Sequence, residues 1–139
     1  MKGWIGVDLD GTLAHYDGWV SPTHIGPPVH AMLERVKGWL AQGYEVRIFT
    51  ARIWPALYSA PGTAGRDAPS QQGAARPAQA DRDAEAAIDA VRAWVKTHVG
   101  QDLALTCVKD TAMVELWDDR AVQVTTNTGW PVGHSTRGL

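Results

Sequence analysis

The sequence predicts an α/β fold with a mainly parallel central sheet. Three segments are predicted to be strands, 4–9, 44–50 and 113–118, and the first is nearly continuously apolar, as in a buried strand. Segments whose apolar residues recur with helical spacing lie between the strands. All three segments end in, or lead into, polar residues. Alternating strands and helices favour parallel pairing, because each helix carries the chain back across the sheet. We expect a sheet centred on 4–9, with the other two segments on either side.

The first strand leads into an acidic turn. Asp8 and Asp10 are expected to point to the same face, because side chains alternate along a strand. Carboxylates this close repel each other, and a divalent cation with a preference for oxygen ligands, such as Mg²⁺, would remove the conflict. Gly11 permits a sharp turn and the close approach of a ligand. The loop at 11–26 leaves beside this pair, and it either folds over the pair as a flap or lies on the surface.

The first helix is expected to start at Pro27-Pro28, where a missing N–H costs nothing. Apolar residues then recur at helical spacing as far as Leu40, and Gly43 is expected to end the helix. The strand at 44–50 follows and ends in the hydroxyl of Thr50.

Residues 55–80 have a different composition. They are rich in Pro, Gly, Ala, Gln and Ser, and no large apolar residue follows Tyr58. We expect an irregular insertion, because such a segment cannot bury enough apolar surface to offset its ordering entropy. A helix follows, capped by Asp81 or Asp83 and ended by Gly100.

The C-terminal part contains two β-prone segments, 103–108 and 113–117. Only four residues separate them, which is too few for a parallel crossover. They are therefore expected either to pair antiparallel or to form one strand preceded by an extended stretch. Residues 121–125 are a further strand candidate, and 127–139 are expected to be an irregular tail.

Length and composition indicate a single domain, 1–139, in a reducing compartment. The length is about one domain, and the single Cys107 excludes an intramolecular disulfide. The net charge of −2 gives no basic field, so nucleic acid is an open but less favoured partner. The sequence has no signal-peptide pattern and no apolar run of membrane-spanning length. We expect a cytoplasmic protein with no membrane partner.

Polar residues end three of the predicted strands, and ligands of parallel α/β sheets bind beyond the carboxyl ends of strands. The motifs there are Asp8-Leu9-Asp10-Gly11-Thr12, Ile48-Phe49-Thr50 and Leu116-Trp117-Asp118-Asp119. They resemble, in this order, the first, second and fourth motifs of the haloacid dehalogenase (HAD) superfamily of phosphohydrolases. The run from Trp117 to Val124 is also similar to polynucleotide kinase phosphatase domains. The resemblance implies a three-layer Rossmann-like fold. It also implies a capless member, because the insertions at 11–26 and 51–82 are too small for a typical cap domain.

The resemblance also implies roles for the acidic residues. Asp8 would be the nucleophile that forms an aspartyl-phosphate, and Asp10 would be the general acid and then the general base. Thr50 would hydrogen-bond a phosphate oxygen. The Mg²⁺ site would consist of Asp8, the backbone carbonyl of Asp10, Asp118 and Asp119. Asp119 is the preferred direct ligand of the last two.

The cation that faces the phosphate is harder to assign. Lys109 is the natural candidate for the third motif, but it precedes Asp118 by only nine residues. If the intervening chain is extended, Lys109 lies roughly 25–30 Å away at ~3.3 Å per residue. Arg52, two residues after Thr50, is the alternative. Gly11 is expected to border the phosphate.

The function implied is a Mg²⁺-dependent phosphatase acting on a nucleotide or other small phosphorylated metabolite. A polynucleotide-end or phosphoprotein phosphatase, and a non-catalytic phosphate- or metal-binding module, are the alternatives. A homo-oligomer in which a neighbour closes the site also stays open. Trp19 and Trp54, on the loops that leave the first and second strands, are candidates for stacking on a nucleobase or sugar, with ordinary packing as the alternative.

Overall fold

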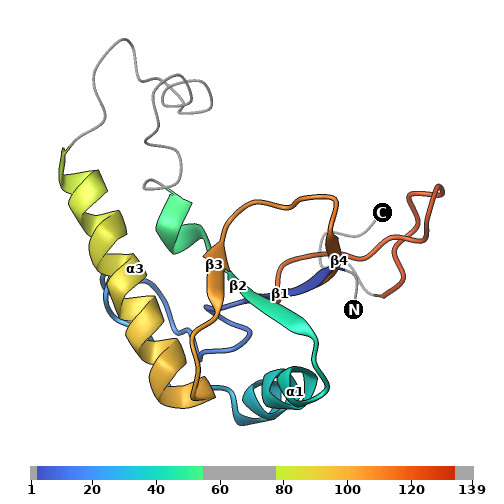
Figure 1. The fold of residues 1–139 in the computed structure, drawn as a ribbon. Coiled ribbons are helices and arrows are strands. Elements are labelled where there is room, and N and C mark those ends of the chain that lie inside the picture. Colours follow the sequence, from blue (N-terminus) through green and yellow to red (C-terminus); the bar gives the residue numbers. More distant parts are fainter. Residues whose placement is uncertain (1–2, 55–77, 134–139) are drawn as a thin grey trace, which may run out of the picture.

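The structure is a computed structural model that describes residues 3–54 and 78–133. Its elements, in chain order, are β1 (Trp4–Asp8), α1 (His30–Ala41), β2 (Glu45–Phe49), the short 3₁₀ helix η1 (Ala51–Ile53), α3 (Ala78–Val99), β3 (Ala104–Thr106) and β4 (Met113–Trp117) (Figure 1). All strands pair in parallel in the order β3-β2-β1-β4. The predicted α/β class and parallel sheet are confirmed, and β1 lies between β2 and β4 as expected.

Both helices pack on one face of the sheet. Ile5 and Val7 of β1 are in register with Val46 and Ile48 of β2, so these four side chains share a face. They belong to one buried cluster with residues of both helices, including Met32, Leu33 and Val36 of α1 and Val91, Val95 and Val99 of α3. Right-handed crossovers that step outward from β1 to β2 to β3 place both helices on the same side. Among the described residues no helix covers the opposite face, so the expected three-layer arrangement is not seen in this part of the chain.

The return from β3 to β4 crosses that opposite face in residues 107–112, which we call the strap and which end in a turn at Asp110–Met113 (Figure 1). A right-handed connection running back past β2 and β1 is expected on the side away from the helices. The chain must travel about 13 Å along the strands and about 14 Å across them, a diagonal of about 19 Å. Seven fully extended residues would reach about 23–25 Å, so the strap can cover this distance even with its turn at Asp110–Met113. Both sequence-based alternatives for 103–108 and 113–117 are therefore wrong, because the two segments are separate strands, β3 and β4, that lie parallel in one sheet with β2 and β1 between them.

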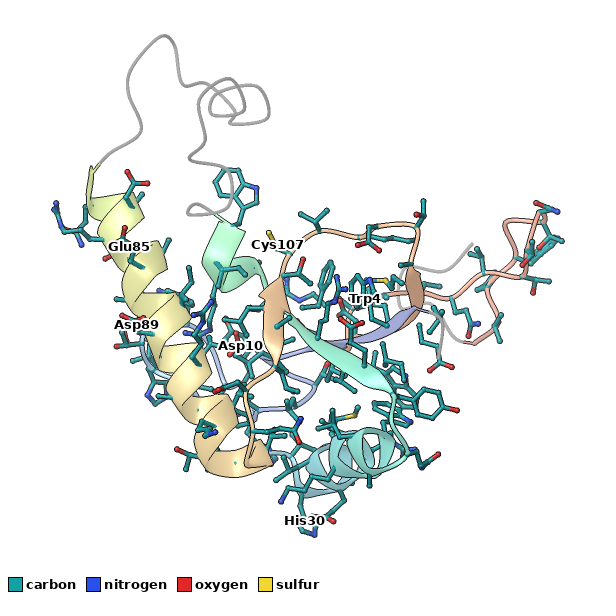
Figure 2. The ribbon with its side chains drawn as sticks, viewed as in Figure 1. Trp4, Asp10, His30, Glu85, Asp89 and Cys107 are labelled. Carbon is teal, nitrogen blue, oxygen red and sulfur yellow. The ribbon has the colours of Figure 1, made fainter. Side chains whose placement is uncertain are left out.

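Asp110 fixes the strap to the sheet. Its carboxylate accepts the indole N–H of Trp4 at 2.9 Å and the backbone N–H of Ala112 at 2.8 Å, and it lies 3.6 Å from the guanidinium of Arg47. These contacts, with the Trp4 hydrogen bond first, lower the pKa of Asp110. Trp4 is fully buried beneath the strap, with the Arg47 guanidinium 4.5 Å from its ring centre (Figure 2). The strap thereby sets the start of β4 against β1.

Several predicted boundaries shift. The first helix begins at His30 rather than Pro27, because residues 27–29 pair with 13–15 through backbone hydrogen bonds. The second begins at Ala78, so the last three residues of the predicted insertion are helical. The rest of that insertion, 55–77, lies outside the described residues. The two helices end just before Gly43 and Gly100, as expected.

The C-terminal segment is more ordered than predicted. Residues 121–133 form an arm that extends away from the sheet (Figure 1). It folds back on itself, because the N–H of Thr125 donates to the carbonyl of Trp130 and the N–H of Val132 donates to that of Gln123. The predicted strand at 121–125 is reduced to a single bridge at Val124. The end of the predicted tail, 134–139, lies outside the described residues. Within the described part of the chain, no helix has the length and apolar character needed to cross a membrane.

Candidate functional site

The predicted site residues meet at the carboxyl ends of β1, β2 and β4. The chain leaves β1 towards β2 and returns to β4 on the other side, so the strand order reverses beside β1, where such sheets bind ligands. A cavity of about 560 Å³ opens at this edge. It is bordered by Asp8, Asp10, Thr50 and Asp118, together with residues of the 11–26 loop, η1 and the start of α3. Figure 2 shows Asp10 between α3 and the sheet.

Three carboxylates form a tight group at one side of this cavity. Oxygen atoms of Asp8, Asp118 and Asp119 lie within 4.8 Å of one another. Thr12 connects two of them: its hydroxyl lies 3.3 Å from Asp8 Oδ2 and 3.4 Å from Asp119 Oδ1, and it accepts the backbone N–H of Asp119 at 3.1 Å. The threonine of the first motif therefore ties the end of β1 to the end of β4.

Gly11 allows this close approach. Its φ is 91°, and a Cβ there would lie 2.5 Å from Asp119 Oδ2. A side chain at this position would push Asp119 away from Asp8. The structure thus places Gly11 against an acidic side chain of the cluster, and its phosphate-bordering role stays a prediction.

The cluster is electrostatically unfavourable without a cation. Burial, the charge of Asp118 and the hydrogen bond that protonated Asp8 shares with Asp119 raise the pKa of Asp8 to about 7. Near neutral pH, a large share of the molecules would therefore carry a proton on this residue. A divalent ion would stabilise the ionised form instead.

The donor set fits Mg²⁺. It consists of three carboxylates, and Mg²⁺ prefers hard oxygen ligands with water in the remaining positions. All three are at least partly exposed to solvent, and Asp119 is the most exposed, which leaves room for bound water. Asp8, Asp118 and Asp119 would hold the ion. The side chain of Asp10 is not in the cluster, and its predicted contribution through the backbone carbonyl stays a prediction.

The raised pKa of Asp8 predicts pH-dependent metal binding. Apparent Mg²⁺ affinity should be steady above about pH 8 and fall by up to about tenfold per unit below about pH 6, because Asp8 must lose its proton first. In the folded, metal-free protein the pKa of Asp8 is about 7, whereas its ordinary value, expected in the unfolded chain, is 3.8. Between these two pH values the folded protein therefore keeps a proton that the unfolded chain has lost. The contribution of Asp8 to stability should therefore be largest below about pH 3.8 and be lost as the pH rises towards 7. Calorimetric titration with Mg²⁺ between pH 5.5 and 8.5 measures the first effect.

Asp8→Asn is the control for this titration, because it removes the titrating group and should flatten the pH dependence. An affinity for Mg²⁺ that is equally strong at pH 5.5 and pH 8.5 in the unaltered protein would contradict the assignment.

Asp10 borders the same cavity but lies outside the acidic cluster. Strand β1 ends at Asp8, and the chain then turns, with the N–H of Leu13 donating to the Asp8 carbonyl and that of Ala14 to the Leu9 carbonyl. Strand alternation therefore does not extend to residue 10, although Asp8 and Asp10 both border the cavity as expected. Asp10 is not part of the group formed by Asp8, Asp118 and Asp119. Instead, the two oxygens of Asp10 accept Arg52 Nε at 2.7 Å and Arg52 Nη2 at 2.9 Å.

Contacts with Asp10 and with the 11–26 loop take up the hydrogen-bond donors of Arg52. Its side chain is 5% exposed and also donates to the backbone carbonyls of Ser21 (3.2 Å), Pro22 (2.8 Å) and His24 (2.7 Å). A guanidinium has five N–H donors, and all are engaged here. Arg52 lines the cavity, but it clamps Asp10 and the loop rather than offering free donors to a phosphate.

The 11–26 loop forms a wall of the cavity. Tyr16, Trp19 and Pro22 border the cavity, and besides Arg52 the loop is held by Trp94 of α3, whose indole N–H donates to the Gly26 carbonyl at 2.9 Å. The sequence left a flap and a surface loop open, and these contacts place part of the loop over the site.

Thr50 offers a hydroxyl to the cavity. It is 2% exposed and lies at the end of β2, where its backbone N–H donates to Thr106 and its side chain accepts the N–H of Arg52 at 3.2 Å. No described residue accepts its hydroxyl proton. Because Thr50 borders the cavity, this proton is available to an anionic oxygen there.

The two side chains Lys109 and Arg120 differ in whether they reach the cavity as a cation for the phosphate. Lys109 lies on the strap, does not border the cavity, and its side chain bonds to no described residue. Arg120 borders the cavity, and its guanidinium makes no hydrogen bond or ion pair with any described residue. Sequence reasoning did not select Arg120, although it directly follows Asp118-Asp119, in the run that resembles polynucleotide kinase phosphatase domains. Its position next to the two acidic residues was the sequence feature from which its place at the site could have been predicted.

Comparisons with known proteins add no relative. A scan against protein-family models, a search of curated proteins and a search of solved structures each found no significant match.

Proposed function

We propose that this protein is a Mg²⁺-dependent phosphatase that hydrolyses a phosphate monoester, with a HAD-like fold and no cap domain. The observation that carries the proposal is the acidic cluster at the switch point of the sheet, in which the pKa of Asp8 is raised to about 7. It is supported by the cavity beside it, where the hydroxyl of Thr50 and the guanidinium of Arg120 have no described acceptor or partner. A cytoplasmic location and a small phosphorylated substrate belong to the same proposal.

In this mechanism, a carboxylate oxygen of Asp8 attacks phosphorus and the bond from phosphorus to the leaving oxygen breaks. Thr50 and Arg120 hold the other phosphate oxygens and stabilise the charge that builds up on them. Water then attacks the aspartyl-phosphate at phosphorus, which releases inorganic phosphate and restores Asp8. Bound Mg²⁺ would supply charge neutralisation between the nucleophile and the phosphate.

Asp10 is the proton carrier in this proposal. It donates a proton to the leaving oxygen and later takes one from the attacking water. Arg52 uses one lone pair of each oxygen, so the proton would be carried on one of the two lone pairs that remain. The same ion pair is also the observation that favours a non-catalytic metal- and phosphate-binding module, because it holds both oxygens of Asp10 against Arg52 rather than against a substrate.

Hydrolysis of p-nitrophenyl phosphate separates the two functions. A phosphatase should release p-nitrophenol with Mg²⁺ at a rate at least about a hundredfold above that with excess EDTA. Ca²⁺, which is larger and less suited to compact octahedral sites, should support a lower rate. Mg²⁺ binding without any release of p-nitrophenol would favour the module.

Arg120 is predicted to be the main cation for the phosphate. Arg120→Met should lower kcat/KM by about tenfold to a hundredfold, because a charge-assisted pair of hydrogen bonds to the phosphate is lost. Arg120→Lys should recover part of the loss, since it keeps the charge but not the bidentate geometry. Lys109→Met is the matched comparison and should lose much less. A larger loss for Lys109→Met than for Arg120→Met would reverse the assignment.

A further inference from the structure

The cavity is larger than a phosphoryl group requires, and much of its remaining lining is aromatic. Tyr16, Trp19, Phe49 and Trp54 all border it, and we call these four residues the aromatic wall. They come from the 11–26 loop, the end of β2 and the residue after η1, so separate parts of the chain bring aromatic rings to one space. A volume of about 560 Å³ is in the range of sites that bind a whole small molecule.

Trp19 is positioned without being buried. Its side chain is among the exposed large apolar groups, at 59%, yet the guanidinium of Arg52 lies 5.0 Å from its ring centre. Arg52 is itself fixed by Asp10 and by carbonyls of the same loop. The indole is therefore held by a rigid cation on one side and is open to solvent and the cavity elsewhere. A tryptophan that is both fixed in place and exposed to solvent can stack on the ring of a ligand without first being ordered.

Three polar groups near the aromatic wall could hydrogen-bond to a heterocyclic base. Two of them are donors and one is an acceptor. Neither the indole N–H of Trp19 nor the hydroxyl of Tyr16 bonds to a described residue. Asp83 of α3 borders the same cavity and accepts only the side-chain amide of Gln79, at 2.6 Å, among its described contacts. Ring nitrogens and exocyclic oxygens of a nucleobase could accept from the first two groups, and exocyclic amines or ribose hydroxyls could donate to Asp83.

We propose that the substrate is a mononucleotide, with its nucleobase stacked on the aromatic wall and its phosphate at the acidic end. This inference rests on the proposed phosphatase function. A mononucleotide is favoured over a nucleic-acid strand because the chain has a net charge of −2 and its site is rich in carboxylates, which would repel a run of phosphates.

The test compares adenosine 5′-monophosphate with ribose 5-phosphate, which has the same phosphate and sugar without the base. The unaltered protein with Mg²⁺ should show a kcat/KM at least about tenfold higher on the nucleotide, because stacking of one base contributes about this much. Trp19→Ala should lose at least about tenfold more on the nucleotide than on ribose 5-phosphate, mainly through KM. Trp19→Phe should recover most of this preference. Trp130→Ala, which removes an equally exposed tryptophan on the arm, should leave the preference unchanged.

Adenosine, which has no phosphate, separates this inference from the phosphatase function. Saturation-transfer NMR should detect adenosine bound to the unaltered protein and should lose the signal in Trp19→Ala. Phosphatase activity with equal kcat/KM on both esters, or a preference for a phosphorylated oligonucleotide over the mononucleotide, would overturn the inference and leave the phosphatase function intact. Adenosine binding by a protein that hydrolyses no ester would overturn the phosphatase function and leave the nucleobase site standing.

Discussion

Asp8→Asn should abolish turnover, with a fall in kcat of about four orders of magnitude or more. An amide oxygen is a poor nucleophile, and the variant also loses one of the three carboxylates of the acidic cluster. The side chains have the same shape, so the surrounding packing at the end of β1 is retained. Steady-state hydrolysis of p-nitrophenyl phosphate at saturating Mg²⁺ measures the loss.

Unfolding should not explain the loss in this variant. Removing one carboxylate relieves the repulsion that raises the pKa of Asp8, so metal-free Asp8→Asn should be at least as stable as the unaltered protein at pH 8. Asp89→Asn is the matched control, because Asp89 is exposed on α3 and does not border the cavity (Figure 2). Full activity in Asp8→Asn would rule out Asp8 as the nucleophile.

Arg52→Met should have the largest effect on stability, a loss of about 2–4 kcal/mol in the free energy of unfolding. The substitution leaves the carboxylate of Asp10, which is 20% exposed, without its partner. It also removes the donors to the carbonyls of Ser21, Pro22 and His24 that hold the loop. Urea unfolding at pH 7 measures the change.

Two further variants test the cause of this destabilisation. Arg52→Lys should be intermediate, because an ammonium cannot replace the planar fork that joins Asp10 to the loop. Arg82→Met, on the surface of α3, should change stability by less than about 0.5 kcal/mol. The double variant Asp10→Asn with Arg52→Met should be less destabilised than the sum of the single variants, because the unpaired charge is gone. Strict additivity would show that the ion pair carries no coupling energy.

The convergence of the site could be predicted from the sequence because it depends on strand direction alone. Parallel strands end at the same edge, so Asp8, Thr50 and Asp118 are brought near one another once the strands are recognised. The helices could be predicted for a similar reason, because the periodicity of their apolar residues and the glycines after them are local signals.

Three features could not be predicted from the sequence: the contacts of Asp10, the role of Arg52 and the path of the strap. Each depends on how the chain turns between the strands. The pairing of Asp10 with Arg52 was not predicted, because β1 ends two residues earlier and the alternation rule does not describe the turn that follows. The role of Arg52 depends on carbonyls of a loop some thirty residues away in the sequence, which carry no side-chain signal. The strap follows from the strand order and the handedness of its crossover, and neither is a property of residues 107–112 themselves.

The most direct test of the phosphatase mechanism is to trap the phosphoryl group on the protein. The protein and Mg²⁺ would be mixed with excess p-nitrophenyl phosphate and quenched in acid within one turnover, and the peptides would be analysed by mass spectrometry. One phosphoryl group on Asp8, absent when EDTA replaces Mg²⁺ and absent in Asp8→Asn, is the predicted result. Turnover with no phosphoryl group on any peptide, or with the group on a residue other than Asp8, would contradict it.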